Sequence, residues 1–146
     1  MSDEKIVSIM RDCFGAMEKG DVEKGLSFWA EDGVWITPAG TFKGKEEVKR
    51  YLTWMAESMQ DVKITETGNG IIAQGDKAFI EHNIAGTFQG MRVEVLAVCA
   101  WEFSNGRIQR MSTVMDRLSM ARQGAKGWLA KWLVNSIVKR AEKGLR

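Results

Sequence analysis

The spacing of apolar residues changes near residue 60, and this change constrains the fold of the chain more than any other feature. Before it, over residues 4–19 and 45–59, apolar side chains recur every three or four positions, which is typical of amphipathic helices. After it, apolar and polar side chains alternate, which is typical of strands that bury one face. The sequence therefore predicts helices mainly in the first half and strands in the second.

Turn signals divide the second half into four predicted strands, which cover residues 61–73, 77–88, 91–103 and 107–116. The residues that separate them, 75–76, 89–90 and 105–106, each include a glycine and are typical of hairpin turns. A short helix after Asp21 and a short strand that ends at Pro38 precede the helix at 45–59. Because helices and strands are segregated, we expect an α+β fold with three N-terminal helices packed on a mainly antiparallel sheet.

Composition narrows the class of protein. The 146 residues include one histidine and two cysteines, Cys13 and Cys99, in different segments. This spacing gives neither a zinc motif nor a disulfide framework, so we expect no metal site and a reducing, cytoplasmic location. The sequence has no run of about 18 apolar residues that could span a membrane, and its acidic start does not resemble a signal peptide. It also has no glycine motif for binding phosphate, so we expect no cofactor.

The charge is unevenly distributed along the chain. Residues 1–116 carry a net charge of −5 and residues 117–146 carry +7, although the whole chain sums to +2. We expect one domain over residues 1–123 and, in residues 124–146, a basic amphipathic helix at 126–143. One face of this helix is formed by Leu129, Trp132, Leu133, Ser136, Ile137 and Arg140.

Two kinds of contact suit such a helix. It docks on the acidic body or on a second copy of the chain, or it binds an anionic membrane surface or an acidic partner. Membrane binding would place the protein peripherally at that surface. Nucleic acid is not an expected partner, because the strands offer no row of exposed aromatic and basic side chains.

The predicted strand at 91–103 is apolar on both faces. Val93, Val95 and Ala97 alternate with Leu96, Val98 and Ala100. A sheet whose outer face is also apolar usually meets another subunit. We therefore expect a homodimer through this face; the alternative is that the protein's own C-terminal segment covers it.

Two stretches carry a resemblance to a known family, GDVEKGLSFWAEDGVWITPAGTFKGKEEVKRYL and SNGRIQRMSTVMDRLSM. Over about residues 4–123 the chain resembles the SnoaL-like group of the superfamily that includes nuclear transport factor 2, ketosteroid isomerase and limonene-epoxide hydrolase. The resemblance implies a cone-shaped, cystatin-like fold in which a curved sheet wraps round the helices and encloses a deep apolar pocket. It also implies a cofactor-independent isomerase, dehydratase, hydrolase or polyketide cyclase that acts on a hydrophobic small molecule.

Within this resemblance, alternation along the strands indicates which side chains face the pocket. The expected substrate-binding residues are Trp35, Ile80, Ile84, Val95, Ala97, Met111 and Met115, with Tyr51 and Trp54 from the helix at 45–59. The expected catalytic residues are His82, Thr37 and Thr113. His82 is the only histidine and would act as acid and base near neutral pH, with the two hydroxyl groups as partners. The alternative for His82 is a histidine that merely packs in the core.

The sequence departs from the family at its acidic positions. Thr37 stands where ketosteroid isomerases carry their catalytic aspartate. His82 and Thr113 stand where epoxide hydrolases carry two aspartates, and Ile80 stands in place of their arginine. These departures leave open an alternative function: a non-catalytic protein that binds a lipophilic ligand, or an interaction scaffold.

Overall fold

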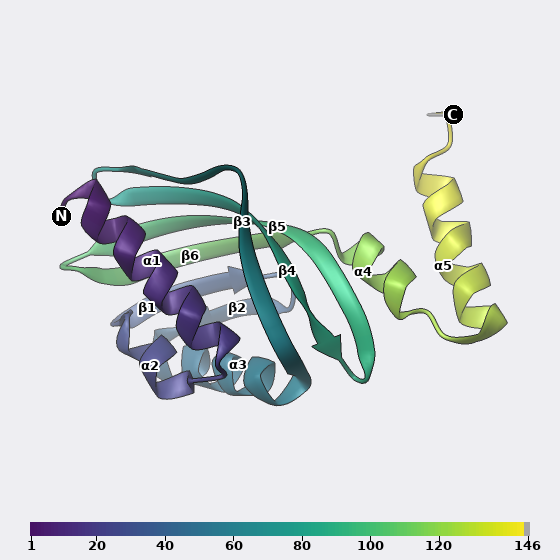
Figure 1. Ribbon diagram of the computed structural model, residues 1–146, viewed down its shortest axis with the longest axis horizontal. Helices are drawn as coiled ribbons and strands as arrows, with labels where there is room; N and C mark the ends of the chain where they lie inside the picture. Colours follow the sequence, from purple (N-terminus) through teal and green to yellow (C-terminus); the bar gives the residue numbers. More distant parts are fainter. Residues whose placement is uncertain (145–146) are drawn as a thin grey trace.

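The computed structural model describes residues 1–144 and begins with helices, as expected (Figure 1). Helices α1 (Asp3–Glu18) and α2 (Val22–Ser27) are followed by the strands β1 (Trp29–Thr37) and β2 (Gly40–Lys43) and then by helix α3 (Gly44–Ser58). Four longer strands follow: β3 (Met59–Gln74), β4 (Lys77–Phe88), β5 (Met91–Ser104) and β6 (Arg107–Met115). The chain continues into α4 (Arg117–Gly124) and α5 (Gly127–Ala141).

The strands form one six-stranded sheet in the order β2-β1-β6-β5-β4-β3. All neighbours are antiparallel except β1 and β6, which run parallel. The sheet curves round α1, and α2 and α3 complete the helical layer (Figure 1). The predicted α+β architecture is therefore confirmed.

Two hairpin turns explain why the last three strands pair as they do. Gln89 and Gly90 between β4 and β5 have positive φ angles of 48° and 75°, and Asn105 and Gly106 between β5 and β6 have 50° and 76°. Two successive residues with positive φ form the tight turn whose twist matches that of antiparallel strands. Residues 77–88 consequently pair with residues 91–102 without interruption.

Strand β3 is the irregular strand of the sheet and lies at its edge. Its pairing with β4 shifts between Gln60 and Lys63 and again between Glu66 and Ile71. The second irregularity contains Gly68 and Gly70, with φ angles of 58° and 67°. Such bulges bend a strand and increase its twist, and β3 curves over α1 (Figure 1).

Three elements differ from the sequence predictions. Strand β2 was not expected, because only four residues form it. Helix α4 was not expected as a separate element; Asp116 begins it by accepting a hydrogen bond from the Ser119 N–H at 2.9 Å. The expected basic helix is present as α5, but it contacts α4 and projects away from the sheet rather than docking on the body (Figure 1).

Within residues 1–144, no helix has both the length and the apolar character needed to cross a membrane.

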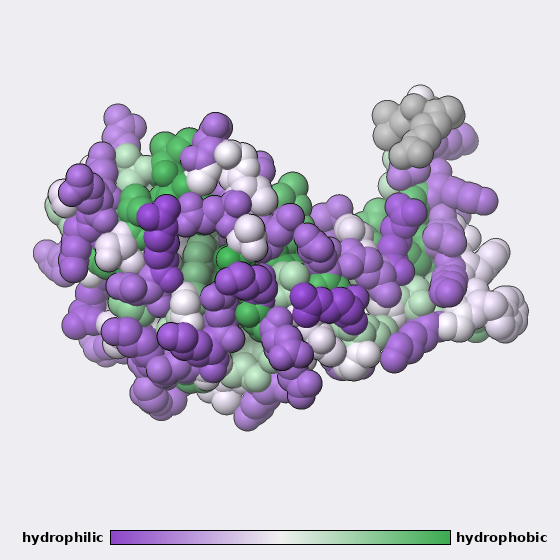
Figure 2. Space-filling view, in the orientation of Figure 1, coloured by the Kyte–Doolittle hydropathy of each residue, from purple (hydrophilic) through white to green (hydrophobic). Residues whose placement is uncertain are grey.

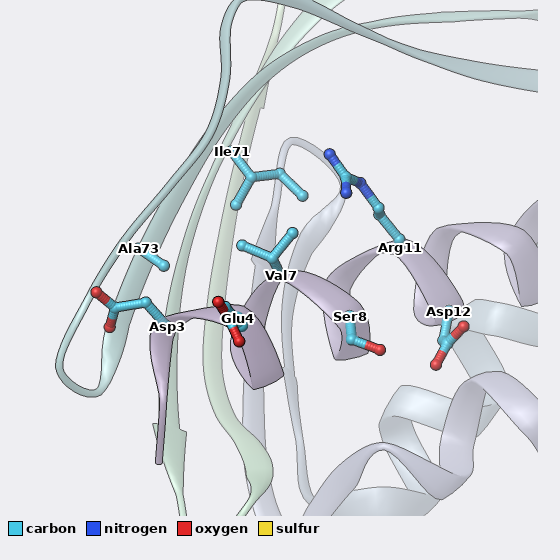
Figure 3. Close-up of a pocket in the computed structure, with 8 residues that line it drawn as sticks. All are labelled: Asp3, Glu4, Val7, Ser8, Arg11, Asp12, Ile71 and Ala73. Carbon is cyan, nitrogen blue, oxygen red and sulfur yellow. The ribbon is translucent and has the colours of Figure 1, made fainter.

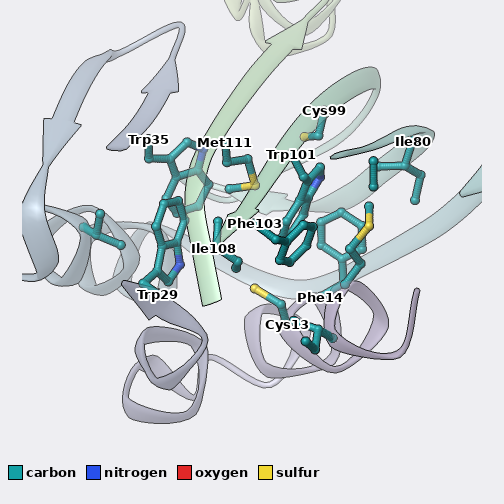
Figure 4. Close-up of a cluster of buried hydrophobic side chains, with 14 of the residues drawn as sticks. Cys13, Phe14, Trp29, Trp35, Ile80, Cys99, Trp101, Phe103, Ile108 and Met111 are labelled. Atoms are coloured by element: carbon teal, nitrogen blue, oxygen red, sulfur yellow. The ribbon is translucent and has the colours of Figure 1, made fainter. Parts of the chain in front are cut away.

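The core lies between α1, α3 and the concave face of the sheet, and it is rich in aromatic rings (Figure 4). Trp29, Trp101, Ile80 and Met111 are fully buried. The ring of Phe14 on α1 meets Trp101 edge to face, with 5.5 Å between centroids. Edge-to-face packing adds to the large apolar area that these rings remove from water.

The convex face of the sheet carries exposed apolar side chains. Phe79 and Ile72 pair across β3 and β4, and Leu96 and Val114 lie on β5 and β6. Helix α4 contacts β5, where Gln123 bonds the Glu94 backbone, but within residues 1–144 these four side chains stay exposed. The predicted homodimer through this face stays a prediction.

We expect Trp101→Ala to lower the free energy of unfolding by about 3–5 kcal/mol, because it leaves a large cavity in the core. Trp54→Ala is the matched control. This indole is 47% exposed, so its loss is expected to cost about 1 kcal/mol. Urea unfolding followed by circular dichroism measures both. Equal losses would show that the core does not depend on Trp101.

We also expect sedimentation equilibrium to give twice the mass of one chain. The double change Leu96→Glu and Val114→Glu places charge on the convex face and is expected to give single chains with an unchanged circular dichroism spectrum. Lys5→Gln with Lys19→Gln, at exposed positions of α1 and its C-cap, changes the net charge by the same two units and is the control. A wild-type mass of one chain would contradict the dimer.

Candidate functional site

Two adjacent rows of side chains on the concave face contain two of the three expected catalytic residues, His82 and Thr113. One row runs from Ile80 on β4 through Cys99 on β5 to Thr113 on β6. The next row runs from Glu66 on β3 through His82 to Ala97 and Met115. Directly paired residues of antiparallel strands project to the same face. The pairing therefore places His82 and Thr113 on one face but in different rows.

His82 is buried in the interior, with 1% of its surface exposed. Its imidazole packs against the ring of Phe14, with 4.9 Å between centroids. Its Nδ1 atom has no hydrogen-bond partner among the described residues. Burial lowers the pKa of His82, and the backbone of Ile80 opposes this effect in part. The imidazole is thus a neutral group at physiological pH, with one ring nitrogen unused.

Thr113 is held in place by two neighbours. Trp35 donates a hydrogen bond from Nε1 to Thr113 Oγ1 at 3.0 Å, and the Cys99 sulfur lies 3.3 Å from the same oxygen. Burial raises the pKa of Cys99 to about 11 and that of Cys13 to about 12. Both thiols are therefore protonated and poor nucleophiles. Cys99 acts here as a hydrogen-bond neighbour of Thr113.

Thr37 lies apart from the other two expected catalytic residues. Its hydroxyl donates to the Gly40 carbonyl at 3.1 Å and accepts from the Ala39 N–H at 3.0 Å. Both bonds close the turn between β1 and β2. No hydrogen bond joins Thr37, His82 and Thr113 to one another within residues 1–144. The structure therefore gives Thr37 a role in a turn.

An aromatic series connects the core to the surface. Trp29 stacks on Trp35 at 5.3 Å, and Trp35 meets Tyr51 edge to face at 4.9 Å. Tyr51 stacks on Trp54 at 5.7 Å, and Trp54 is half exposed at the rim, where Phe88 lies 6.2 Å away. Burial is the main cause that raises the pKa of Tyr51. Of the two helix residues expected in the pocket, Tyr51 is buried and Trp54 is not.

The other expected wall residues lie on the concave face. Ile80, Val95, Ala97 and Met111 are buried, whereas Ile84 and Met115 are partly buried. The interior around Trp35, Ile80 and Met111 is filled by side chains, because each of these residues is at most 3% exposed. The deep pocket that the resemblance implied stays a prediction that requires side chains to move.

Glu66 is a carboxylate that the sequence analysis missed. It pairs with His82 across β3 and β4, so the two Cβ atoms are about 5 Å apart. Arg11 on α1 donates to both carboxylate oxygens of Glu66, at 2.7 and 3.2 Å. The hydrogen bond from Arg11 lowers the pKa of Glu66. Alternation along residues 61–73 could have identified this residue, because Glu66 lies two positions from the inward-facing Ile64.

An open groove of about 630 Å³ lies between α1 and β3 (Figure 3). Its lining consists of Asp3, Glu4, Val7, Ser8, Arg11, Asp12, Ile71 and Ala73. Of these, Arg11 is the residue that contacts the Glu66 carboxylate. The groove thus lies beside the concave interior, on the outer side of the α1–β3 contact.

Within residues 1–144, no three histidine, cysteine, aspartate or glutamate side chains are grouped as metal ligands.

We expect the pKa of His82 to be below its unfolded value of about 6.5. Between that folded-state pKa and about 6.5, the unfolded chain binds the proton that the folded chain does not. The free energy of unfolding therefore falls as the pH is lowered through this window. Above about pH 6.5 the contribution of the neutral His82 is fully present.

Urea unfolding from pH 8 to pH 5 is expected to show a steeper loss of stability for the wild type than for His82→Phe. The carboxylates titrate in both proteins and cancel in the comparison. The NMR signals of the single imidazole give the pKa directly. A value at or above 6.5, or equal pH slopes, would contradict a buried neutral histidine.

Comparisons with known proteins agree with this architecture. A family model described as "SnoaL-like domain" matches residues 10–111. No curated protein matches the chain. Solved structures do match: a protein of the nuclear transport factor 2-like fold from Burkholderia xenovorans is 28% identical, with a TM-score of 0.68, and the match covers 84% of this chain and 98% of that one.

Two further solved structures share the fold at lower identity. A candidate isomerase from Bacillus subtilis is 18% identical with a TM-score of 0.74, covering 88% of this chain and 99% of that one. A candidate SnoaL-like polyketide cyclase from Shewanella denitrificans is 14% identical with a TM-score of 0.71, covering 80% and 93%. With the family model matching more than half of its length, the chain belongs to the SnoaL-like domain family of the nuclear transport factor 2-like fold.

Proposed function

We propose that the chain is a cofactor-independent enzyme that moves a proton on a hydrophobic ketone, with His82 as the acid and base. The observation that carries the proposal is the unpartnered Nδ1 atom of this fully buried histidine. A buried polar atom without a partner costs about 1–3 kcal/mol. A ligand that contacts Nδ1 would offset this cost.

A second buried polar atom without a hydrogen-bond partner lies on a ring that, like the His82 imidazole, packs against Phe14. Trp101 Nε1 is buried without a hydrogen-bond partner among residues 1–144. Phe14 packs against both His82 and Trp101, at 4.9 and 5.5 Å between centroids. Movement of the Phe14 ring would open space between the imidazole of His82 and the indole of Trp101, whose N–H has no partner. A substrate oxygen would accept a hydrogen bond from that N–H.

The reaction balances without a co-reactant. Nδ1 takes a proton from the carbon next to the carbonyl, the C–H electron pair forms a C–C double bond, and the carbonyl oxygen becomes an enolate. The imidazolium then returns the proton. Return to a different carbon gives an isomer. In the alternative, the enolate carbon attacks a second carbonyl of the same molecule, a C–C bond closes the ring, and the resulting alkoxide takes the proton from the imidazolium. Both outcomes fit the isomerase and cyclase types of the family.

The surroundings of His82 suit a reversible proton transfer. Its lowered pKa keeps the imidazole neutral and ready to accept a proton. Glu66 on the neighbouring strand is negatively charged and would stabilise the imidazolium, while Arg11 holds it in place. These groups take the place of the family's catalytic carboxylates, because Thr37 and Thr113 have none.

The test uses cyclic β,γ-unsaturated ketones as probes and follows hydrogen–deuterium exchange next to the carbonyl by proton NMR. We expect His82→Gln to slow the exchange on the order of 100-fold or more, which is typical of losing a general base. Asn83→Ala is the matched control, because Asn83 is the next residue of the same strand and faces the convex side. Equal rates in His82→Gln and wild type would sink the assignment of His82.

A non-catalytic function has its own support. The interior is filled, and the hydroxyl groups of Thr37 and Thr113 are used within the protein. If the same ketones quench tryptophan fluorescence in both wild type and His82→Gln but exchange no hydrogen, the protein is a binder of lipophilic ligands. If they neither bind nor exchange, an interaction scaffold is the better reading.

A further inference from the structure

Helix α5 has one covered side and one free side. Its less exposed apolar side chains, Ala130, Val134 and Val138, are spaced four residues apart and so lie on one line along the helix. The large apolar side chains Trp128, Leu129, Trp132, Leu133 and Ile137 are each at least half exposed. At 3.6 residues per turn, these five lie within one half of the helix, and Ile137 borders the covered line. The free side is therefore apolar over its first three turns.

Two cations of α5, Lys139 and Arg140, lie on the free side of the helix, and two further lysines flank it. By the same helical geometry, Lys139 and Arg140 fall within the half that carries the five apolar side chains, whereas Lys131 falls on the covered half. Lys126 and Lys143 flank the helix, and all five cations are exposed. Glu142 is the acid of this segment, and it falls on the covered side and is partly buried. The free side thus combines apolar and positive groups without a negative one.

The position of α5 leaves this side accessible. The helix contacts α4 and projects from the body (Figure 1), and Figure 2 shows it as an arm beyond the main mass of the molecule. Gly127 begins it with a φ of 79°, a left-handed conformation that turns the chain away from α4. The five apolar side chains are therefore open to a partner.

We propose that the free side of α5 binds an anionic membrane surface. A helix that lies at a bilayer surface needs a wide apolar face for the boundary of the acyl chains and cations for the headgroups, and tryptophan is favoured at that depth. The free side provides all three on one half of the helix. Charge complementarity selects anionic lipids, because the segment from residue 117 onward carries a net charge of +7. This inference does not depend on the proposed proton transfer.

The test is co-sedimentation of the full chain with vesicles of phosphatidylcholine alone and with 30% phosphatidylserine. We expect at least tenfold tighter binding to the anionic vesicles at 50 mM salt and a loss of most of this difference at 500 mM, because salt screens the attraction. The tryptophan emission is expected to shift to shorter wavelength on binding.

Two pairs of changes separate the apolar and charged contributions. Trp128→Ser with Trp132→Ser, and separately Lys139→Glu with Lys143→Glu, are each expected to weaken binding at least tenfold. Lys5→Glu with Lys19→Glu changes the net charge equally on α1 and is expected to retain most of the binding. The altered α5 side chains are exposed, so circular dichroism and the melting temperature should stay unchanged.

Three results would overturn the proposal. The first is a wild-type chain that does not bind anionic vesicles at 50 mM salt. The second is equal weakening by the α1 pair and the α5 lysine pair, which would mean that only net charge matters. The third is that the wild-type chain is a dimer that binds no vesicles and that Trp128→Ser with Trp132→Ser converts it into single chains. That result would assign the free side to a second copy of the chain.

Discussion

The unbroken pairing of β4 with β5 determines the rest of this structure. Because side chains alternate along a strand, this register decides in a single step which residues enter the core and which face outward. It directs Ile80, His82, Val95 and Trp101 to the concave face. A slip by one residue would exchange them with Glu81, Leu96 and Ala100. The two-residue turn at Gln89 and Gly90 leaves no spare residue for such a slip.

The alternation that sets this register is also what made the fold predictable. Helix α1, helix α3 and the four long strands follow from local apolar spacing, and the inward face of β5 was read correctly from it. Strand β2 was missed because four residues carry too little pattern, and its pairing with β1 depends on the turn that Thr37 closes. The start of α5 near residue 126 was expected, but helix α4 was missed, because its eight residues bury no side chain and its start depends on the local cap at Asp116.

The candidate site was predictable only in part, because its contacts join distant segments. Spacing within one strand indicates that Thr113 points inward, but not that Trp35 and Cys99 use its hydroxyl. The pairing of Glu66 with His82 depends on how β3 is bulged, and the hold of Arg11 on Glu66 depends on where α1 crosses the sheet. The fold of this family hosts different functions. The function of this chain must therefore be inferred from its own buried polar atoms.

The bulged edge strand described above has a consequence for the behaviour of the protein in concentrated solution. An unpaired edge of a sheet can recruit further strands and build fibres. On β3, Gly68 and Gly70 interrupt the straight ladder that such recruitment needs. Earlier in β3, the Ile64 N–H donates a hydrogen bond to Glu18 on α1 at 2.6 Å. This N–H group is therefore not free to pair with another strand. The irregularity that bends β3 also protects the chain against aggregation through this edge.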